Sequence, residues 1–395
     1  MPAEKRVLLL NTNHNNLGLI KGLKKLGYTI IATGLPSGCV GEKFCDKYVA
    51  ADYTDRKRIL EIIKEEHIDR ICGSCNDHAM LTAAYVAEKL GWPGYDSYDT
   101  TELLFNKDRF KDLCEKLGII APWTRRFTSK EDALKFIDDA QMPVIVKPVD
   151  SSGGIGVSIV RDKSKAAEAL DYALEKSRAK RLIVEQYLEG TQHGMCTFIV
   201  DQKVRAICSD DEYSIATPYQ TDIDTYPSER FSEFRDIVKA EIEKISEYLK
   251  LSDGIFHVQL IMKDGVPYIL EPMRRAIGNM YSVPADMLTE MQWDYWEARA
   301  LTGESCKEFP GDIKQQGFFA YKVIKSAHNG IIKDIVIPKE YEKYVVSKII
   351  LRNKGEEIHN HPFEHIGILF FMFKSFKEMK DVLITNYRYD LVVIE

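Results

Sequence analysis

Short apolar runs alternate with amphipathic segments along the N-terminal quarter of the chain. The apolar runs predict strands at 7–10, 28–32, 48–50 and 70–72, and helical periodicity predicts helices at 17–26, 57–66 and 77–90. Strands that alternate with helices at this spacing predict an α/β fold with a doubly wound parallel sheet. Ligands of such sheets bind beyond the carboxyl ends of the strands, here near 11–16 and 73–77.

A glycine-rich loop separates two apolar runs in the stretch VIVKPVDSSGGIGV, residues 144–157. This pattern predicts two strands joined by a loop, with Lys147 at the end of the first strand. Glycines let backbone N–H groups approach a polyphosphate, and a lysine adds a point charge beside it. An ordinary glycine hairpin is the alternative. The loop residues are Ser151, Ser152, Gly153, Gly154 and Gly156.

The segment around this loop predicts a small unit that moves as a lid. Helices are expected at 130–139 and 164–176, and a strand at 182–185. Upstream, Asn106 is expected to cap a helix at 107–117. Lys107 then stands in the first turn, where a positive charge does not favour the helix dipole. It is either a solvated lysine or a residue held there for another purpose.

The middle of the chain predicts strands at 195–200 and 204–208, followed by a long polar loop at 210–230 that covers a site. The next segment, 231–249, is strongly amphipathic and predicts a helix. Its apolar side is formed by Phe234, Ile237, Ile242, Ile245 and Leu249.

A predicted hairpin follows in the stretch GIFHVQLIMKDGVPYILEPMRRAIGN, residues 254–279. With a three-residue turn at 263–265, His257 faces Glu271 and Gln259 lies diagonal to it. Side-chain oxygens at that spacing can share one magnesium ion. Arg274 and Arg275 follow directly. A hairpin with an ordinary polar outer face is the alternative.

Composition narrows the classes of function. The chain has 395 residues, 45% hydrophobic and 29% charged, with a net charge of −6. This charge gives no electrostatic reason to expect nucleic acid or an anionic membrane as a partner. No apolar run approaches the length of a membrane span, and the N-terminus lacks a secretory pattern, so a cytoplasmic location is expected. The eight cysteines are expected to be free thiols, and Cys72 and Cys75 ordinary buried thiols in preference to a redox pair.

The ordered motifs resemble those of the ATP-grasp enzymes. The relevant branch includes biotin carboxylase, carbamoyl-phosphate synthetase, the purine-pathway ligases and the L-amino-acid ligases. The resemblance covers about residues 1–305. It implies a leading α/β domain at 1–105, an ATP-grasp domain at 106–305 with a mobile lid at about 122–187 and a central antiparallel sheet, and a small β-rich C-terminal domain at 311–395.

The resemblance also implies roles for individual residues. In NKDRFKDLCEKLGI, Lys107 would reach ATP, and Lys147 would contact the α-phosphate beside the glycine loop. In IVEQYLEG, Glu185 and Leu188 would hold adenine. Other residues expected to bind the nucleotide are Gln186, Tyr187, Gln192 and His193. Glu271 and Gln259 would bind Mg²⁺, with Mn²⁺ as a possible substitute, and Arg275, with Arg274, would orient the reacting carboxylate.

Two positions depart from the family pattern. Gln259 stands where an acidic residue is usual, and Met273 stands where an Asn is usual. An amide oxygen lacks the negative charge of a carboxylate, and a thioether is a poor ligand for a hard cation, so weaker metal binding is expected. Three histidines of the C-terminal region are expected to be surface residues near a turn and not a metal site: His359, His361 and His365.

The leading hypothesis is an ATP-dependent carboxylate–amine ligase that acts through an acyl-phosphate. Its partners would be a small-molecule carboxylate and an amine, and relatives of this kind are often homodimers. One alternative is a nucleotide-binding regulatory module with impaired catalysis, which Gln259 and Met273 favour. Another is a carboxylase of the purine-pathway type.

Overall fold

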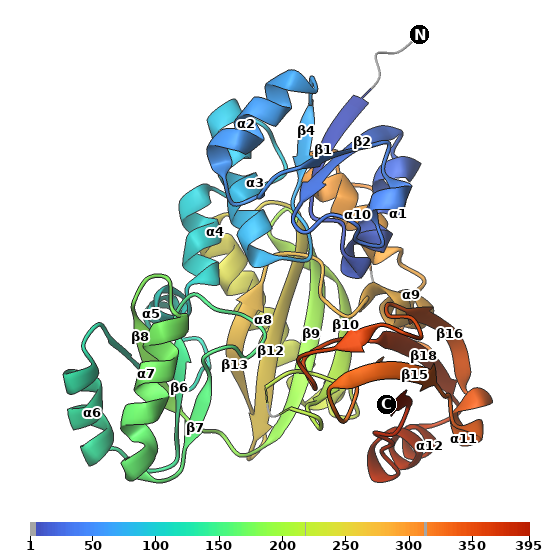
Figure 1. The fold of residues 1–395 in the computed structure, drawn as a ribbon. Coiled ribbons are helices and arrows are strands. Elements are labelled where there is room, and N and C mark those ends of the chain that lie inside the picture. The colour runs from blue at the N-terminus through green and yellow to red at the C-terminus, as the bar shows by residue number, and fades with distance from the viewer. Residues whose placement is uncertain (1–4, 218, 312–313) are drawn as a thin grey trace.

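The computed structural model describes residues 5–217, 219–311 and 314–395. An N-terminal α/β unit lies at the top of Figure 1, the lid at the lower left, and the C-terminal strands at the lower right. Long strands of a central sheet run between these parts. The architecture has the α/β leading unit, the lid and the central antiparallel sheet that the sequence predicts.

Four parallel strands form the N-terminal sheet in the order β3-β2-β1-β4, which confirms the predicted parallel sheet. Its strands are β1 (Lys5–Leu10), β2 (Tyr28–Gly34), β3 (Lys47–Ala50) and β4 (Arg70–Cys72). Its helices are α1 (Leu17–Lys25), α2 (Arg56–Glu65) and α3 (Asp77–Leu90). Helix α3 begins where the Asn76 side chain accepts from the N–H groups of His78 and Ala79, and it ends at Gly91, whose φ is +68°.

Two helices lead from this unit to the lid. They are α4 (Tyr98–Phe105), which the sequence pattern did not predict, and α5 (Lys107–Leu117). Asn106 is the N-cap residue of α5, as predicted, but its side chain makes no capping hydrogen bond to that helix. Instead, Asn106 Nδ2 donates to the carbonyl of Glu102, at the end of α4.

The lid is a four-stranded sheet in the order β5-β8-β6-β7, covered by two helices (Figure 1). The strands are β5 (Thr124–Phe127), β6 (Val144–Pro148), β7 (Ser158–Val160) and β8 (Leu182–Gln186). The helices are α6 (Lys130–Asp139) and α7 (Ala166–Lys176). The glycine loop joins β6 to β7, as the sequence predicts.

The central sheet has eight strands in the order β13-β12-β9-β10-β11-β14-β18-β16. Its first five are β9 (Thr191–Val200), β10 (Lys203–Tyr213), β11 (Ile223–Tyr226), β12 (Gly254–Lys263) and β13 (Val266–Met273). The predicted polar loop at 210–230 is therefore wrong at both ends. Residues 210–213 continue β10, and β11 lies inside the sheet. Asp and Glu are uncommon in strands, so their presence in both segments led to the prediction of a loop.

The β12–β13 hairpin differs from the predicted register. Lys263 pairs with Val266, so the turn has two residues, and a bulge lies between Gln259 and Leu260. Gln259 consequently faces Glu271 directly, and His257 faces Met273. The prediction that His257 faces Glu271 is therefore wrong, because the turn is one residue shorter than expected and the strand contains a bulge.

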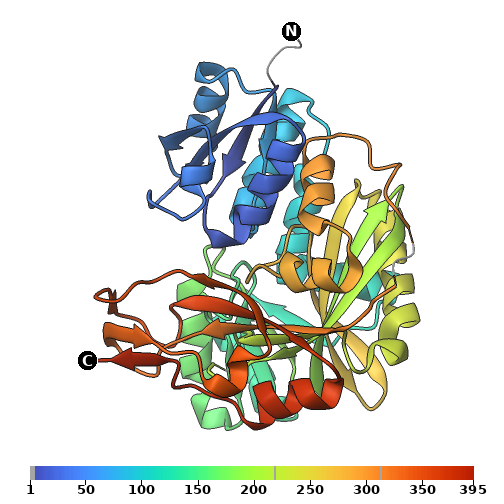
Figure 2. The same cartoon turned by 90° about the vertical axis from the view of Figure 1, so that its right-hand side faces the viewer.

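Three of the C-terminal strands extend the central sheet. These strands are β14 (Phe318–Ile324), β16 (Val345–Ile350) and β18 (Gly367–Phe373), and β14 pairs with β11. A separate small sheet is formed by β15 (Gly330–Ile335), β17 (Glu357–Ile358) and β19 (Val392–Ile394). In Figure 2 this region lies nearest the viewer at the lower left, in front of the lid. The remaining helices are α9 (Ser282–Thr289), α10 (Trp293–Leu301), α11 (Lys339–Glu342) and α12 (Phe376–Lys380).

Helix α8 (Phe231–Leu249) begins and ends where the sequence predicts. Phe234, Ile242 and Ile245 are fully buried in one core with strands β9, β12 and β13. Ile237, which was expected on the same side, is 41% exposed. The apolar face of α8 is therefore narrower than its sequence pattern indicates.

This difference within one helix gives a matched test. Phe234→Ala should lower the free energy of unfolding by about 3–5 kcal/mol, because it leaves a cavity in a closed core. Ile237→Ala should change it by less than about 0.5 kcal/mol. Urea unfolding followed by circular dichroism measures both, and similar losses in the two variants would contradict the placement of Ile237.

Candidate active site

Two adjacent cavities lie between the lid, the central sheet and the N-terminal unit. One cavity, of about 270 Å³, is lined by Lys147 and by residues 185–188, which we call the hinge segment. We call it the nucleotide cavity. The other, of about 340 Å³, is lined by Arg275, Glu212 and Asp224, and we call it the substrate cavity. Both are lined by the same group of residues, and these form a shared wall: Lys107, Ser151, Ser152, Gly153, Gly154, Tyr219, Gln259 and Glu271.

Lys107 lies in this wall and not in solvent. Its Nζ is 2.8 Å from Glu271 Oε2 and donates to the carbonyl of Ser151 at 2.8 Å. Burial lowers the pKa of Lys107, but attraction to Glu271 outweighs this effect and the pKa ends above its ordinary value. The ammonium group thus ties α5 to both the hairpin and the glycine loop.

A second lysine of α5 was missed by the sequence reasoning. Lys111 Nζ is 3.2 Å from Glu185 Oε2 and donates to the carbonyl of Ile269 at 3.1 Å. Lys147 Nζ contacts the other carboxylate oxygen of Glu185. The spacing of Lys111 from Lys107, four residues, places both on one helix face and could have identified it.

The hinge segment therefore divides its residues between two tasks. Leu188, Gln186 and Tyr187 line the nucleotide cavity, together with Glu185. The Glu185 carboxylate, however, is 1% exposed and is engaged by two lysines. Its side chain positions Lys147, and both of its carboxylate oxygens are already engaged by lysines.

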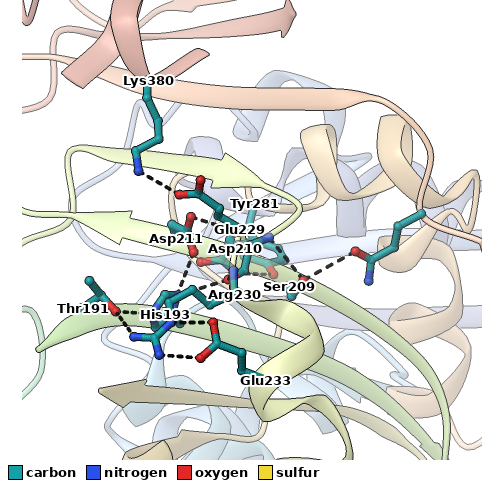
Figure 3. A network of polar contacts seen from close by, with 12 residues as sticks. Thr191, His193, Ser209, Asp210, Asp211, Glu229, Arg230, Glu233, Tyr281 and Lys380 are labelled. Carbon is teal, nitrogen blue, oxygen red and sulfur yellow. Dashed lines mark hydrogen bonds and ion pairs between the residues drawn. The ribbon is translucent and has the colours of Figure 1, made fainter. Parts of the chain in front are cut away.

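Gln192 and His193 lie on opposite faces of β9. Gln192 lines the nucleotide cavity. His193 is buried on the face toward α8, where its Nδ1 is 2.7 Å from Asp211 Oδ1 and its ring is 5.4 Å from that of Phe234 (Figure 3). The alternation of side chains along a strand separates the two neighbours, so the structure does not bring His193 into the candidate site.

The glycine loop adopts backbone conformations that favour glycine. Gly153, Gly154 and Gly156 have φ values of +64°, +75° and +80°. A Cβ on Gly154 would lie 2.4 Å from the Cβ of Tyr219. Tyr219 also accepts a hydrogen bond from the N–H of Ile159 at 3.0 Å, so it holds both sides of the loop.

The two predicted arginines have different environments. Arg275 forms a bidentate pair with Asp77 of α3, through Nε at 2.5 Å and Nη2 at 3.1 Å. Since a guanidinium has five N–H donors, and Nη1 uses one on the carbonyl of Ala276, two donors remain.

Arg274 is engaged by Asp96, at 2.9 Å, and by the carbonyls of Ser252 and Ile255. Its contacts join the N-terminal unit to β12 and give it a structural role.

The donor set at the shared wall fits a magnesium ion held partly by phosphates. Glu271 offers a carboxylate, and Gln259, directly opposite, offers an amide oxygen. Magnesium sites commonly combine one or two carboxylates with phosphate oxygens of the substrate. Met273 faces His257 in the register and adds no oxygen ligand. Among the described residues, no group of three or more His, Cys, Asp or Glu could by itself hold a metal.

Glu212 supplies a carboxylate next to Gln259 that sequence reasoning missed. Its Oε2 accepts from Gln259 Nε2 at 2.6 Å and from Gln192 Nε2 at 2.5 Å. Burial raises the pKa of Glu212 to about 7, against the opposing effect of these hydrogen bonds. Asp224 faces it on β11, and burial together with the charge of Glu212 raises the pKa of Asp224 well above its ordinary range. Glu212 fell within the segment that was predicted to be a loop.

Other candidate residues lie outside the two cavities or have ordinary roles. Cys72 and Cys75 are free thiols, and burial raises the pKa of each. His359 is exposed, whereas His365 is largely buried, with its ring 6.2 Å from that of His14. Within the described part of the chain, no helix is both long and apolar enough to span a bilayer.

Part of the chain is similar to known proteins. Residues 105–276 match the family described as phosphoribosylglycinamide synthetase, ATP-grasp (A) domain. Over 287 residues, 69% of this chain, it is 26% identical to the carbamoyl phosphate synthase large chain of Clostridium beijerinckii, and it spans about a quarter of that relative's length, 26%.

Solved structures share the fold across the whole chain. The L-amino acid ligase of Bacillus licheniformis superposes with a TM-score of 0.82 at 18% identity, covering 100% of both chains. The biotin carboxylase domain of the Hydrogenobacter thermophilus 2-oxoglutarate carboxylase, a dimer solved with MgADP and bicarbonate, gives a TM-score of 0.79 at 20% identity, covering 99% of this chain and 90% of that one.

The chain has the ATP-grasp fold, and its residues 105–276 carry the match to an ATP-grasp domain.

The buried Glu185 gives a prediction of stability against pH. Burial raises its pKa, but Lys111 and Lys147 outweigh burial and lower the pKa to about 2, below the ordinary value of 4.5. Its ionised form therefore stabilises the folded state above pH 4.5, by roughly 3 kcal/mol, and this contribution is lost as the pH falls toward 2.

Glu185→Gln should lower the free energy of unfolding at pH 7 by about 3–5 kcal/mol, because two buried lysines lose their partner. Its deficit relative to the parent protein should shrink between pH 4.5 and 2. Urea unfolding across this range measures both, with Glu168→Gln, on the exposed side of α7, as the control. Parallel pH curves for parent and Glu185→Gln would contradict the assignment.

Proposed function

We propose that the chain is an ATP-dependent carboxylate–amine ligase. The observation that carries this proposal is the shared wall: the residues suited to a transferring phosphoryl group separate the nucleotide cavity from a second cavity of similar size. A γ-phosphoryl group at that wall would lie between ATP and an acceptor. Acyl transfer through an acyl-phosphate, which is a mixed anhydride, requires no side-chain nucleophile.

The proposed reaction has two transfers. A carboxylate oxygen of the substrate attacks the γ-phosphorus, and the bond to ADP breaks. An amine nitrogen then attacks the acyl carbon of the resulting acyl-phosphate, the carbon–oxygen bond breaks, and phosphate leaves while the amine loses a proton to solvent. Lys107 and the backbone N–H groups of the glycine loop stabilise charge on the transferring group.

Other residues hold the reactants in place. Lys147, fixed by Glu185, lies in the nucleotide cavity for the phosphates of ATP. The two free donors of Arg275 suit the substrate carboxylate. Glu271 and Gln259 would hold Mg²⁺, which supplies charge neutralisation between phosphates when it is bound. A homodimer is part of this proposal, supported by the dimer of the 2-oxoglutarate carboxylase domain.

One alternative retains support from particular residues. Gln259 and Met273 replace two oxygen-donor positions of the family pattern, which favours a regulatory module that binds ATP without turnover. Glu212 weakens this alternative, since it places a carboxylate beside Gln259. A carboxylase of the purine-pathway type shares the same cavities and differs only in its substrates.

Phosphate release from MgATP tests the ligase directly. Release should require both a carboxylate and an amine from pooled compounds, and Glu271→Gln should lower the rate on the order of 100-fold or more, since it removes the carboxylate from the shared wall. Glu308→Gln, an exposed position, is the control. Release that needs no amine, or that persists in Glu271→Gln, would contradict the proposal.

Gln259→Glu separates the ligase from the impaired module. Because the Gln259 amide donates to Glu212 and faces Glu271, a glutamate here brings three carboxylates together. We expect kcat/KM for ATP to fall on the order of 10-fold or more through this repulsion. Gln141→Glu, exposed on the lid, should have no effect. A gain in magnesium affinity and turnover would support the impaired module.

A further inference from the structure

The substrate cavity contains two facing carboxylates without a cation of the protein to balance them. Glu212 and Asp224 are register partners on β10 and β11, both line the cavity, and they are 8% and 3% exposed. Within residues 5–217, 219–311 and 314–395, neither forms an ion pair with a lysine or arginine. Buried like charges are costly unless a partner of opposite charge is supplied.

Each carboxylate retains an acceptor that the protein does not use. Asp224 Oδ1 is buried and has no hydrogen-bond partner among the described residues, while Oδ2 accepts from the Tyr226 hydroxyl at 3.3 Å. Glu212 Oε2 accepts all three of its donors, from Gln192, Thr221 and Gln259. Glu212 Oε1 lies 4.0 Å from His257 Nε2, too far for a hydrogen bond.

Other polar groups at this end of the cavity also have unused atoms. His257 is 1% exposed, and its Nδ1 has no hydrogen-bond partner within the described chain. Asn279 donates through Nδ2 to the Tyr321 hydroxyl at 3.1 Å, which leaves its Oδ1 as another acceptor. The groups around the two carboxylates therefore retain unused polar atoms.

We propose that Glu212 and Asp224 form a subsite for a protonated amine carried by the carboxylate substrate. An ammonium group has one positive charge and three N–H donors, which match Asp224 Oδ1, Glu212 Oε1 and one neutral acceptor. Arg275 lines the same cavity and suits the carboxylate of that molecule. The substrate class is thus an amino-acid-like compound. This assignment rests on the proposed function, which has the carboxylate of the same molecule activated by ATP.

A metal ion fits these two residues less well than an ammonium group. Divalent hard cations require about six oxygen ligands, and the described chain provides no cluster of three or more potential ligands here. The surrounding groups are phenols, amides and an imidazole, which can accept from N–H donors. The geometry therefore favours a small, singly charged donor.

Binding of matched compounds tests the subsite without turnover. The full chain, saturated with MgADP, is titrated calorimetrically with standard amino acids, β-alanine and γ-aminobutyrate, each compared with the carboxylic acid that lacks the amino group. At least one ammonium compound should bind 10-fold or more tightly than its counterpart. Equal binding within every pair, or no binding of any ammonium compound, would overturn the subsite.

Isosteric variants then test whether Glu212 and Asp224 cause the preference for ammonium compounds. Asp224→Asn and, independently, Glu212→Gln should each weaken binding of the preferred ammonium compound 10-fold or more, with little change for its counterpart. Asp211→Asn is the matched control, because Asp211 neighbours Glu212 on β10 but contacts His193 on the opposite face (Figure 3). Melting temperatures of the free variants identify any that do not fold. Discrimination retained in both folded variants would overturn the assignment.

The outcomes separate this inference from the proposed function. Ammonium-dependent binding with no phosphate release from any pool retains the subsite and overturns the ligase. Phosphate release that the carboxylic acids without an amino group support equally well retains the ligase and overturns the subsite.

Discussion

Two lysines on one face of α5 hold together the parts that form the site. Lys107 joins the helix to the hairpin residue Glu271, and Lys111 joins it to the lid residue Glu185. Lys111 and Glu185 are buried, so each depends on the other side chain remaining in place, whereas the Glu271 side chain of the first pair is 35% exposed. A helix that would otherwise be an ordinary connector thereby fixes the distance between the lid and the central sheet.

Sequence patterns predicted the elements whose side chains follow simple periodicity. The bounds of α3, α5 and α8 agree because apolar stripes determine them locally, with glycine stops after α3 and α5 and the Asn76 cap at the start of α3. Strand β11 and the end of β10 could not be predicted from an apolar pattern, since the side chains that point into the substrate cavity, Glu212 and Asp224, are acidic. The hairpin register failed for another reason: one bulge shifts every later pair, and no residue type marks it unambiguously.

The residues of the candidate site that stand in local sequence motifs could be predicted, whereas most of those that distant segments contribute could not. Lys147 and the glycine loop stand in a recognisable local pattern, and Lys107 and Glu271 were identified by family resemblance. Glu212, Asp224 and Lys111 come from separate elements, and only the order of strands in the sheet brings the first two together. Lys107 of α5 and Lys147 of the lid thus line the nucleotide cavity, and Glu212 and Asp224 of the central sheet line the substrate cavity.

Tyr219 lines both the nucleotide cavity and the substrate cavity. Its hydroxyl is bonded to the lid at Ile159, its backbone packs on Gly154, and two residues later Thr221 donates to Glu212. Any displacement of the lid that moves Tyr219 also alters the surroundings of Glu212. The two cavities therefore share one residue of their walls, and through it the lid is in direct contact with the segment that holds Glu212.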